Sequence, residues 1–285
     1  MSQIYQAAIQ YLYSLHRFGI KLGLSNIRNL LSALGEPQKR VPVIHVGGTN
    51  GKGSVAAFVT SMLKCQGYRV GTFTSPHLED FRERIRIDDR YISPDAVADH
   101  CGCIRSALRE HSGDFTPSGS VTFFEFVTAL AYSHFADEGV DFAIMEVGLG
   151  GRLDSTNTAE PILTVITDID YDHTDRLGNT LRQIAREKCG IIKQGVPLVT
   201  SPQKPEAMKV IEEIVGEKGS ELLVGERDYS WDIKSSGLSG QTFNFSQGSA
   251  ELDELRIQML GKHQVRNAAV ALASCLTLER MGYRV

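Results

Sequence analysis

Residues 43–54 read VIHVGGTNGKGS, a short β-branched apolar run that leads directly into a glycine-rich loop with one lysine. Four glycines in the loop can adopt backbone angles that other residues avoid, so successive N–H groups can converge on phosphate oxygens. Lys52 adds a positive charge, and the helical spacing of the next stretch, SVAAFVTSMLKCQG, directs the positive end of a helix dipole at the same anion. The segment therefore predicts a strand, a phosphate loop (residues 47–54) and a helix.

The phosphate loop is a variant of the usual pattern. The strict pattern has a glycine six residues before the lysine and a hydroxyl residue immediately after it. Val46 and Gly53 occupy those positions here, and the hydroxyl residue, Ser54, comes one place late. A glycine-rich turn with a chance lysine is the structural alternative. The order of strand, loop, lysine, hydroxyl and helix favours phosphate binding.

Composition limits the possible classes of protein. The 285 residues are 42% hydrophobic and 22% charged, enough for a large core in one large domain or two smaller ones. A net charge of −4 gives no general attraction to nucleic acid or anionic membranes. Five scattered cysteines predict reduced thiols and a cytoplasmic location, and Cys101 and Cys103 lack the second ligand pair of a metal site. Without a signal peptide or a long apolar run, we expect neither export nor membrane insertion.

Helical and strand patterns alternate along the chain, which predicts a doubly wound, mostly parallel α/β sheet covered on both faces. Near residues 229–260 the composition shifts to Gly, Ser and Gln with alternating strand patterns, which predicts a small antiparallel β ribbon. Helices are expected near residues 4–16, 25–34, 54–67, 94–111, 121–137, 178–192, 205–217 and 263–282. Strands are expected near residues 43–47, 69–74, 84–92, 141–146, 162–167, 196–200 and 221–224.

Polar residues follow the ends of several predicted strands, where open α/β sheets bind their ligands. Ser75 follows the second strand, Glu146 ends a later one, and the run 168–173 includes His173. Hydroxyl and carboxylate oxygens are suited to magnesium bound to a nucleotide. Taken singly, Ser75 before a proline is an ordinary turn residue, and a glutamate such as Glu146 can simply cap a turn. Their common placement favours a shared cleft.

The chain resembles the bifunctional dihydrofolate synthase/folylpolyglutamate synthase family. The resemblance runs from about residue 20 to the C-terminus and is carried in order by HVGGTNGKGSV, TSPHL, FRERI, TFFEF, MEVGLGGRLDSTN, DIDYDHTDRLG, REKCGIIK and GKHQVRNAAVAL. Related muramyl-peptide ligases share the GTNGK core but usually follow the lysine with threonine and lack EVGLGGRLD and SPHL. The folate branch is therefore favoured.

The resemblance implies binding of ATP and of two magnesium ions, with potassium as a further candidate cation. Lys188 would be carbamylated by carbon dioxide and would bind the second magnesium, since a lysine facing metal cations has a depressed pKa. A plain lysine on a helix surface is the structural alternative. The ATP site would comprise Thr49, Asn50, Gly51, Lys52, Gly53, Ser54 and, against the adenine, Asn267; the metal site would comprise Ser75, Glu146, His173 and Lys188. A helix N-cap or a buried amide is the alternative for Asn267.

The resemblance also implies a pterin site. Its contacts would be Leu22, Gly23, Leu24, Ser25, Thr122, Phe123, Phe124, Glu125, Leu153, Asp154 and Ser155. Phe123 and Phe124 could equally be core residues of the helix at 121–137, and we expect at least one of them to be so.

The implied reaction is ATP-driven amide formation by way of an acyl phosphate, with dihydropteroate or a folate as the acid and L-glutamate as the amine. Lys52, Lys188 and His173 would be the catalytic residues, with His173 a metal ligand rather than a general base. Lys52 and the two cations would stabilise the transferring phosphoryl group. We expect a monomer without nucleic-acid or membrane partners.

The family normally continues into a smaller C-terminal domain that supplies an arginine and an aspartate to ATP and helps to form the glutamate site. We expect residues 1–285 to be the ATP-binding ligase domain, with the C-terminal glutamate-ligase domain absent from this chain. Two other hypotheses stay open. One is a related ligase that acts on a non-folate carboxylic acid, and the other is a non-catalytic ATP-binding module.

Overall fold

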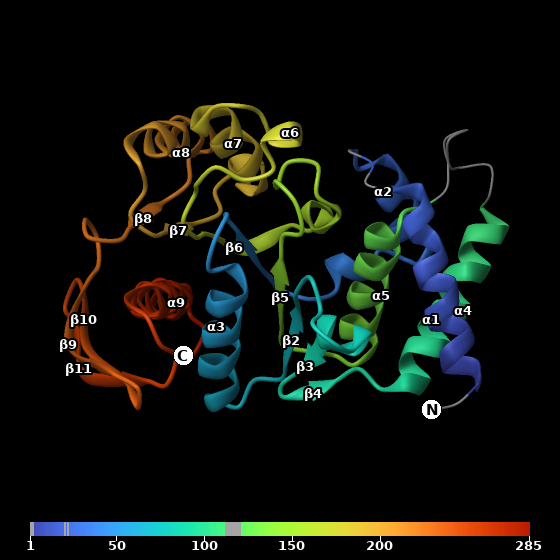
Figure 1. The fold of residues 1–285 in the computed structure, drawn as a ribbon, viewed down its shortest axis with the longest axis horizontal. Helices are drawn as coiled ribbons and strands as arrows, with labels where there is room; N and C mark the ends of the chain where they lie inside the picture. Colours follow the sequence, from blue (N-terminus) through green and yellow to red (C-terminus); the bar gives the residue numbers. More distant parts are fainter. Residues whose placement is uncertain (1–2, 20, 22, 112–120) are drawn as a thin grey trace.

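The computed structural model describes residues 3–19, 21, 23–111 and 121–285, and eight strands within these residues form one sheet (Figure 1). The strand order is β4-β3-β2-β5-β1-β6-β7-β8. The parallel strands are β1 (Val43–Gly47), β2 (Val70–Phe73), β5 (Phe142–Glu146), β6 (Pro161–Ile166), β7 (Leu198–Thr200) and β8 (Leu222–Val224). At one edge, β3 (Ile85–Ile87) pairs antiparallel with both β2 and β4 (Arg90–Tyr91). The predicted doubly wound α/β fold is confirmed.

All five residues of strand β1 are buried. Since successive side chains point to opposite faces of the sheet, both faces must be covered at this strand. Val43 belongs to a core shared with one set of helices, namely α1 (Gln3–Ser14), α2 (Ser25–Ala33), α4 (Pro94–Glu110) and α5 (Phe123–Asp137). Ile44 and Val46 belong to a second core, shared with α3 (Lys52–Cys65) and α9 (Lys262–Arg280). Figure 1 shows the two sets of helices on opposite sides of the sheet.

A third core lies between the sheet and the helices that pack near β7 and β8, at the edge of the sheet opposite β4 (Figure 1). It joins Ile166 and Leu198 to the buried faces of α7 (Leu181–Lys188) and α8 (Pro205–Lys218). The short helix α6 (Thr174–Leu177) contributes Leu177. No helix among the described residues is both long and apolar enough to cross a membrane.

The predicted β ribbon is a separate three-stranded antiparallel sheet. Its strands are β9 (Ser230–Gly237), β10 (Gly240–Gln247) and β11 (Ala250–Ile257). Phe243 and Phe245 are buried in the same core as Val265 of α9. Figure 1 shows α9 between this ribbon and α3, so the ribbon covers the outer side of α9.

The helix expected at 178–192 is the main difference in secondary structure. Thr180 accepts a hydrogen bond from the Gln183 N–H, and the Gln183 side chain accepts one from the Thr180 N–H. This capping box starts α7 at Leu181, and the left-handed backbone at Gly178 (φ 107°) separates it from α6. The chain after α7 narrows to a 3-10 turn, η6 (Cys189–Ile191). Likewise, α1 ends at Ser14 and is followed by a 3-10 turn, η1 (Leu15–Phe18), so the helix expected at 4–16 was slightly too long.

Candidate active site

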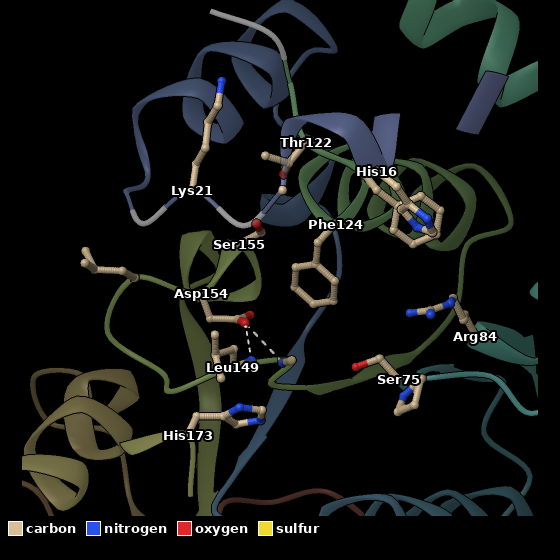
Figure 2. A pocket seen from close by; sticks show the side chains of 15 residues that line it. His16, Lys21, Ser75, Arg84, Thr122, Phe124, Leu149, Asp154, Ser155 and His173 are labelled. Carbon is tan, nitrogen blue, oxygen red and sulfur yellow. Dashed lines mark hydrogen bonds between the residues drawn. The ribbon is translucent and has the colours of Figure 1, made fainter. Parts of the chain in front are cut away.

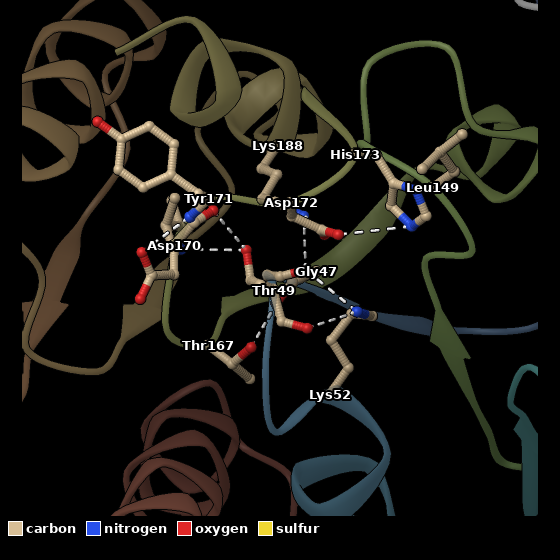
Figure 3. A network of polar contacts seen from close by, with 12 residues as sticks. Gly47, Thr49, Lys52, Leu149, Thr167, Asp170, Tyr171, Asp172, His173 and Lys188 are labelled. Atoms are coloured by element: carbon tan, nitrogen blue, oxygen red, sulfur yellow. Dashed lines mark hydrogen bonds and ion pairs between the residues drawn. The ribbon is translucent and has the colours of Figure 1, made fainter. Parts of the chain in front are cut away.

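The phosphate loop joins the carboxyl end of β1 to the first turn of α3, as predicted. Gly48 and Gly51 have φ angles of 131° and 90°, which a side chain would strain. A Cβ atom on Gly48 would also lie 2.0 Å from Thr167 Oγ1. Lys52 Nζ donates to the carbonyls of Gly48 (3.1 Å) and Thr49 (3.0 Å), so the lysine lies across the loop (Figure 3).

Two neighbouring segments hold the phosphate loop in place. The Thr49 N–H donates to the Asp168 carbonyl at 2.7 Å, and Thr49 Oγ1 donates to the Asp170 carbonyl at 3.1 Å (Figure 3). From the other side, Asn267 Oδ1 of α9 lies 2.5 Å from the position of a Cβ on Gly51. The side chain of Asn267 is buried and donates to Gln264 Oε1. This is the geometry of a buried amide, and contact of Asn267 with adenine stays a prediction.

Glu146 places a buried carboxylate beside the phosphate loop. Its Oε2 accepts a hydrogen bond from the Ser75 N–H at 3.0 Å, and its Oε1 lies 3.7 Å from the position of a Cβ on Gly53. Burial raises the pKa of this carboxyl. Among the described residues no lysine, arginine or histidine nitrogen pairs with it within 4.0 Å. The site can therefore accept a hard cation.

Lys188 is buried at the end of α7, so the helix-surface alternative is wrong. Its Nζ donates to the Gly48 carbonyl and to Asp172 Oδ2, both at 2.9 Å. Burial lowers the pKa of Lys188, and the ion pair with Asp172 opposes that shift. The partners suit an ammonium group, because a carbamate here would face the Asp172 carboxylate. Carbamylation stays a prediction and would require Asp172 to move.

His173 lies on the opposite side of Asp172 from Lys188. Its Nε2 is 3.4 Å from Asp172 Oδ1, and its backbone is left-handed, with φ 41° (Figure 3). The imidazole is more than half exposed and lines the cavity described next. The structure thus brings the three predicted catalytic residues together. Lys52 and Lys188 both donate to the Gly48 carbonyl, and Lys188 and His173 both contact Asp172.

A cavity of about 340 Å³, within the range of small-molecule sites, is lined by Ser75 and His173 (Figure 2). Ser75 connects it to the phosphate loop through Glu146, which lies beside Gly53. Six of the residues predicted to contact the pterin line it, namely Thr122, Phe123, Phe124, Leu153, Asp154 and Ser155. Phe123 is also part of the first core, as expected for at least one of the two phenylalanines. Phe124 stands at the centre of the view, and a Cβ on Gly148 would lie 2.5 Å from its ring.

Asp154 anchors the wall of this cavity. Its Oδ2 accepts from the N–H groups of Gly148 (3.1 Å) and Leu149 (2.9 Å), and Oδ1 accepts from Thr156 Oγ1 at 2.5 Å. Thr156 Oγ1 in turn lies 2.9 Å from His45 Nε2. Because the threonine hydroxyl already donates to Asp154, His45 must be the donor in this contact. A buried polar chain therefore connects β1 to the wall of the cavity.

Four of the residues predicted to bind pterin do not line the cavity, and a fifth cannot be placed. Glu125 Oε2 accepts from both the N–H and the hydroxyl of Thr122, which makes it part of the N-terminal cap of α5. Gly23, Leu24 and Ser25 are not among its described lining residues, and Leu22 lies outside the described residues. Their contacts with substrate stay predictions.

The structure adds residues that sequence reasoning missed. Arg84, His16 and Lys21 line the cavity, and Asp172 pairs with Lys188. Arg84 lies inside the block FRERI, and Asp172 inside DIDYDHTDRLG, but neither block indicates which of its charged residues faces inward. His16 and Lys21 have no sequence signal that singles them out.

Comparison with known proteins agrees with this architecture. The family model of the Mur ligase middle domain matches residues 46–275. The chain is 40% identical over 284 residues to a dihydrofolate synthase/folylpolyglutamate synthase of Bacillus subtilis, covering 98% of this chain and 65% of the relative. A folylpolyglutamate synthase structure from Thermotoga maritima superposes with a TM-score of 0.89 at 43% identity, covering 99% of this chain and 63% of that one.

A structure of folylpolyglutamate synthase in complex with AMPPCP and folate superposes with a TM-score of 0.91 at 36% identity. The match covers 99% of this chain and 68% of that protein. The chain belongs to the Mur ligase family, whose middle domain it contains. Within that family it is similar to dihydrofolate and folylpolyglutamate synthases, as the sequence blocks predicted. It spans about two thirds of the length of these relatives.

Proposed function

We propose that residues 1–285 are the ATP-binding domain of a ligase that joins L-glutamate to a pterin-linked carboxylic acid. The acid would be dihydropteroate, a folate, or both. The observation that carries the proposal is the cavity beside the phosphate loop, where a nucleotide phosphate and an acid substrate would meet. The names of the Bacillus subtilis and Thermotoga maritima relatives support the substrate class.

ATP binding is supported by the phosphate loop at the start of α3. Its glycines free backbone N–H groups for phosphate oxygens, and the helix dipole adds positive potential at the same point. Lys52 would exchange its two loop carbonyls for phosphate oxygens, since it has no carboxylate partner among the described residues. The AMPPCP and folate complex of a similar protein supports this assignment.

Magnesium fits the buried Glu146 carboxylate and the hydroxyl of Ser75, which points into the cavity (Figure 2). The described residues contain no group of three or more His, Cys, Asp and Glu side chains that could hold a metal by themselves. Water and phosphate oxygens would complete the coordination, as is usual for this ion. When bound, magnesium would neutralise charge on the transferring phosphoryl group. A second cation, at a carbamylated Lys188, and a potassium ion belong to the same proposal.

In the proposed reaction, a carboxylate oxygen of the acid attacks the γ-phosphorus of ATP and ADP leaves. The amine of glutamate then attacks the acyl carbon, phosphate leaves, and the amine releases a proton. The residues of this chain chiefly hold and orient the reactants, because phosphoryl transfer depends mainly on positioning and charge. Lys52 would stabilise the phosphoryl oxygens, and Asp154 would keep the wall of the cavity in place.

The proposal is tested by measuring ADP release from the purified chain with ATP, magnesium, dihydropteroate and glutamate, and by a mass spectrum of the pterin products. Formation of dihydrofolate supports the proposal and shows that residues 1–285 suffice. Turnover on another carboxylic acid, with none on any pterin, would select a non-folate ligase. Tight ATP binding without a product from any acid would select the ATP-binding module.

We propose a monomer in the cytoplasm, without nucleic-acid or membrane partners. All five cysteines are free thiols, and three of them are buried, which supports a reducing compartment.

A further inference from the structure

Arg84 is the only buried arginine among the described residues, and it faces the cavity beside the phosphate loop. It ends the 3-10 turn η3 (Phe81–Arg84), and its guanidinium points into the cavity in Figure 2. Its Cζ lies 5.3 Å from the centre of the Phe123 ring. Burying a guanidinium against an aromatic face at the wall of a cavity is costly unless an anion accompanies it.

The structure supplies no such anion from the described part of the chain. The only other buried cation there, Lys188, pairs with Asp172 at 2.9 Å, whereas no carboxylate oxygen lies within 4.0 Å of the Arg84 guanidinium. Glu83, next in sequence, turns its carboxylate to the backbone N–H groups of residues 78–80. The positive charge of Arg84 is therefore left for a ligand.

Contacts with neighbouring side chains fix the orientation of the Arg84 guanidinium. Arg84 Nε donates to His77 Nδ1 at 2.7 Å, and His77 Nε2 lies 3.4 Å from the Tyr13 hydroxyl. Since Nε and the aromatic face fix the plane of the group, its remaining N–H donors form a fork of fixed direction. Such a fork binds a carboxylate through two parallel hydrogen bonds.

We propose that Arg84 binds a carboxylate of the acid substrate other than the one that is activated, which would make it a specificity residue for pterin acids that already carry glutamate. This inference rests on the proposed function. Figure 2 shows Arg84 on one wall of the cavity and His173 on the opposite one. A glutamylated pterin has an α- and a γ-carboxylate, so one can react at the phosphate loop while Arg84 neutralises the other. Dihydropteroate has a single carboxylate and gains nothing from this contact.

The test is isothermal titration calorimetry of the purified chain with AMPPCP and magnesium present. Three ligands are compared: folate, pteroate, and folate in which the α-carboxylate is replaced by a carboxamide. The wild type should bind folate about 10- to 100-fold more tightly than the carboxamide, the effect expected of a charged bidentate contact. In Arg84→Gln that ratio should fall to about 1, while the affinity for pteroate should change by less than about threefold.

Arg82→Gln is the matched control, because Arg82 lies on the same turn, pairs with Asp80 and does not line the cavity. It should keep the wild-type ratio, and Arg84→Lys should keep only part of it, since lysine offers charge without the fork. If Arg84→Gln does not fold, as judged by circular dichroism, Arg84→Lys takes its place: a ratio equal to that of the wild type would then overturn the role of Arg84.

The outcomes separate the two proposals. A wild-type ratio near 1, or an unchanged ratio in a folded Arg84→Gln variant, overturns the role of Arg84 and leaves the proposed function standing. If the wild type binds none of the three pterins, the assignment of pterin acids to this cavity fails, and the role of Arg84 fails with it.

Discussion

Acid should destabilise the folded protein through His45, which is buried in the middle of β1. Its Nε2 donates to Thr156 Oγ1, and its Nδ1 has no partner among the described residues. Burial, with a smaller contribution from the positive charge of Lys193, lowers the pKa of His45 from 6.5 to about 3. Protonation would place a charge, and a donor without an acceptor, inside the sheet.

The magnitude follows from proton linkage. Between pH 6.5 and 3 the unfolded chain binds a proton at this position and the folded protein does not, so stability falls as the pH falls. Above pH 6.5 the His45 side chain is neutral in both the folded and the unfolded chain, so its contribution to the unfolding free energy does not change with pH. At pH 5 the two pKa values correspond to a loss of ~2 kcal/mol of unfolding free energy through His45 alone.

The assay is urea unfolding followed by circular dichroism between pH 8 and pH 5, for the wild type and for His45→Gln. Glutamine can keep the hydrogen bond to Thr156 but cannot be protonated. The wild type should lose ~2 kcal/mol more than the variant over this range. His263→Gln, at an exposed position on α9, should show the same pH dependence as the wild type. If the wild type and His45→Gln gave parallel curves, the assignment of a low pKa to His45 would be wrong.

Three further predictions concern the phosphate loop and the core. Lys52→Ala should abolish ADP release and leave the circular dichroism spectrum unchanged, because Lys52 contacts only loop carbonyls; near-normal turnover would refute the phosphate-binding role. Gly51→Ala should weaken AMPPCP binding in calorimetry, since its Cβ would lie 2.5 Å from Asn267 Oδ1 at a φ of 90°, and unchanged affinity would contradict this account of the loop. Phe126→Ala should lower the unfolding free energy in urea by about 3–5 kcal/mol because the ring is fully buried; a loss below about 1 kcal/mol would show that the core refills the space.

The sequence alone determined the alternation of helices and strands and the unit of strand, phosphate loop and helix. Both are local patterns: the spacing of apolar residues reports which face of an element is buried, and glycines mark the positions where the backbone must turn. The same local logic placed Ser75 and Glu146 at strand ends, and β1, β2 and β5 do bring these ends together. The expected start of the helix at residue 178 was wrong because the capping box at Thr180 starts α7 at Leu181.

Tertiary structure decided how the charges of the site are paired. Lys188 reaches Asp172 and the Gly48 carbonyl, 140 residues away, and Asn267 packs against Gly51 from a helix near the C-terminus. Arg82 and Arg84 lie on the same turn, but Arg84 faces the cavity whereas Arg82 pairs with Asp80. Local sequence does not encode these contacts, because burial and partner depend on which distant segment arrives beside each side chain. A motif can therefore predict phosphate binding in this domain, whereas only the folded chain determines which charged groups lie around that site.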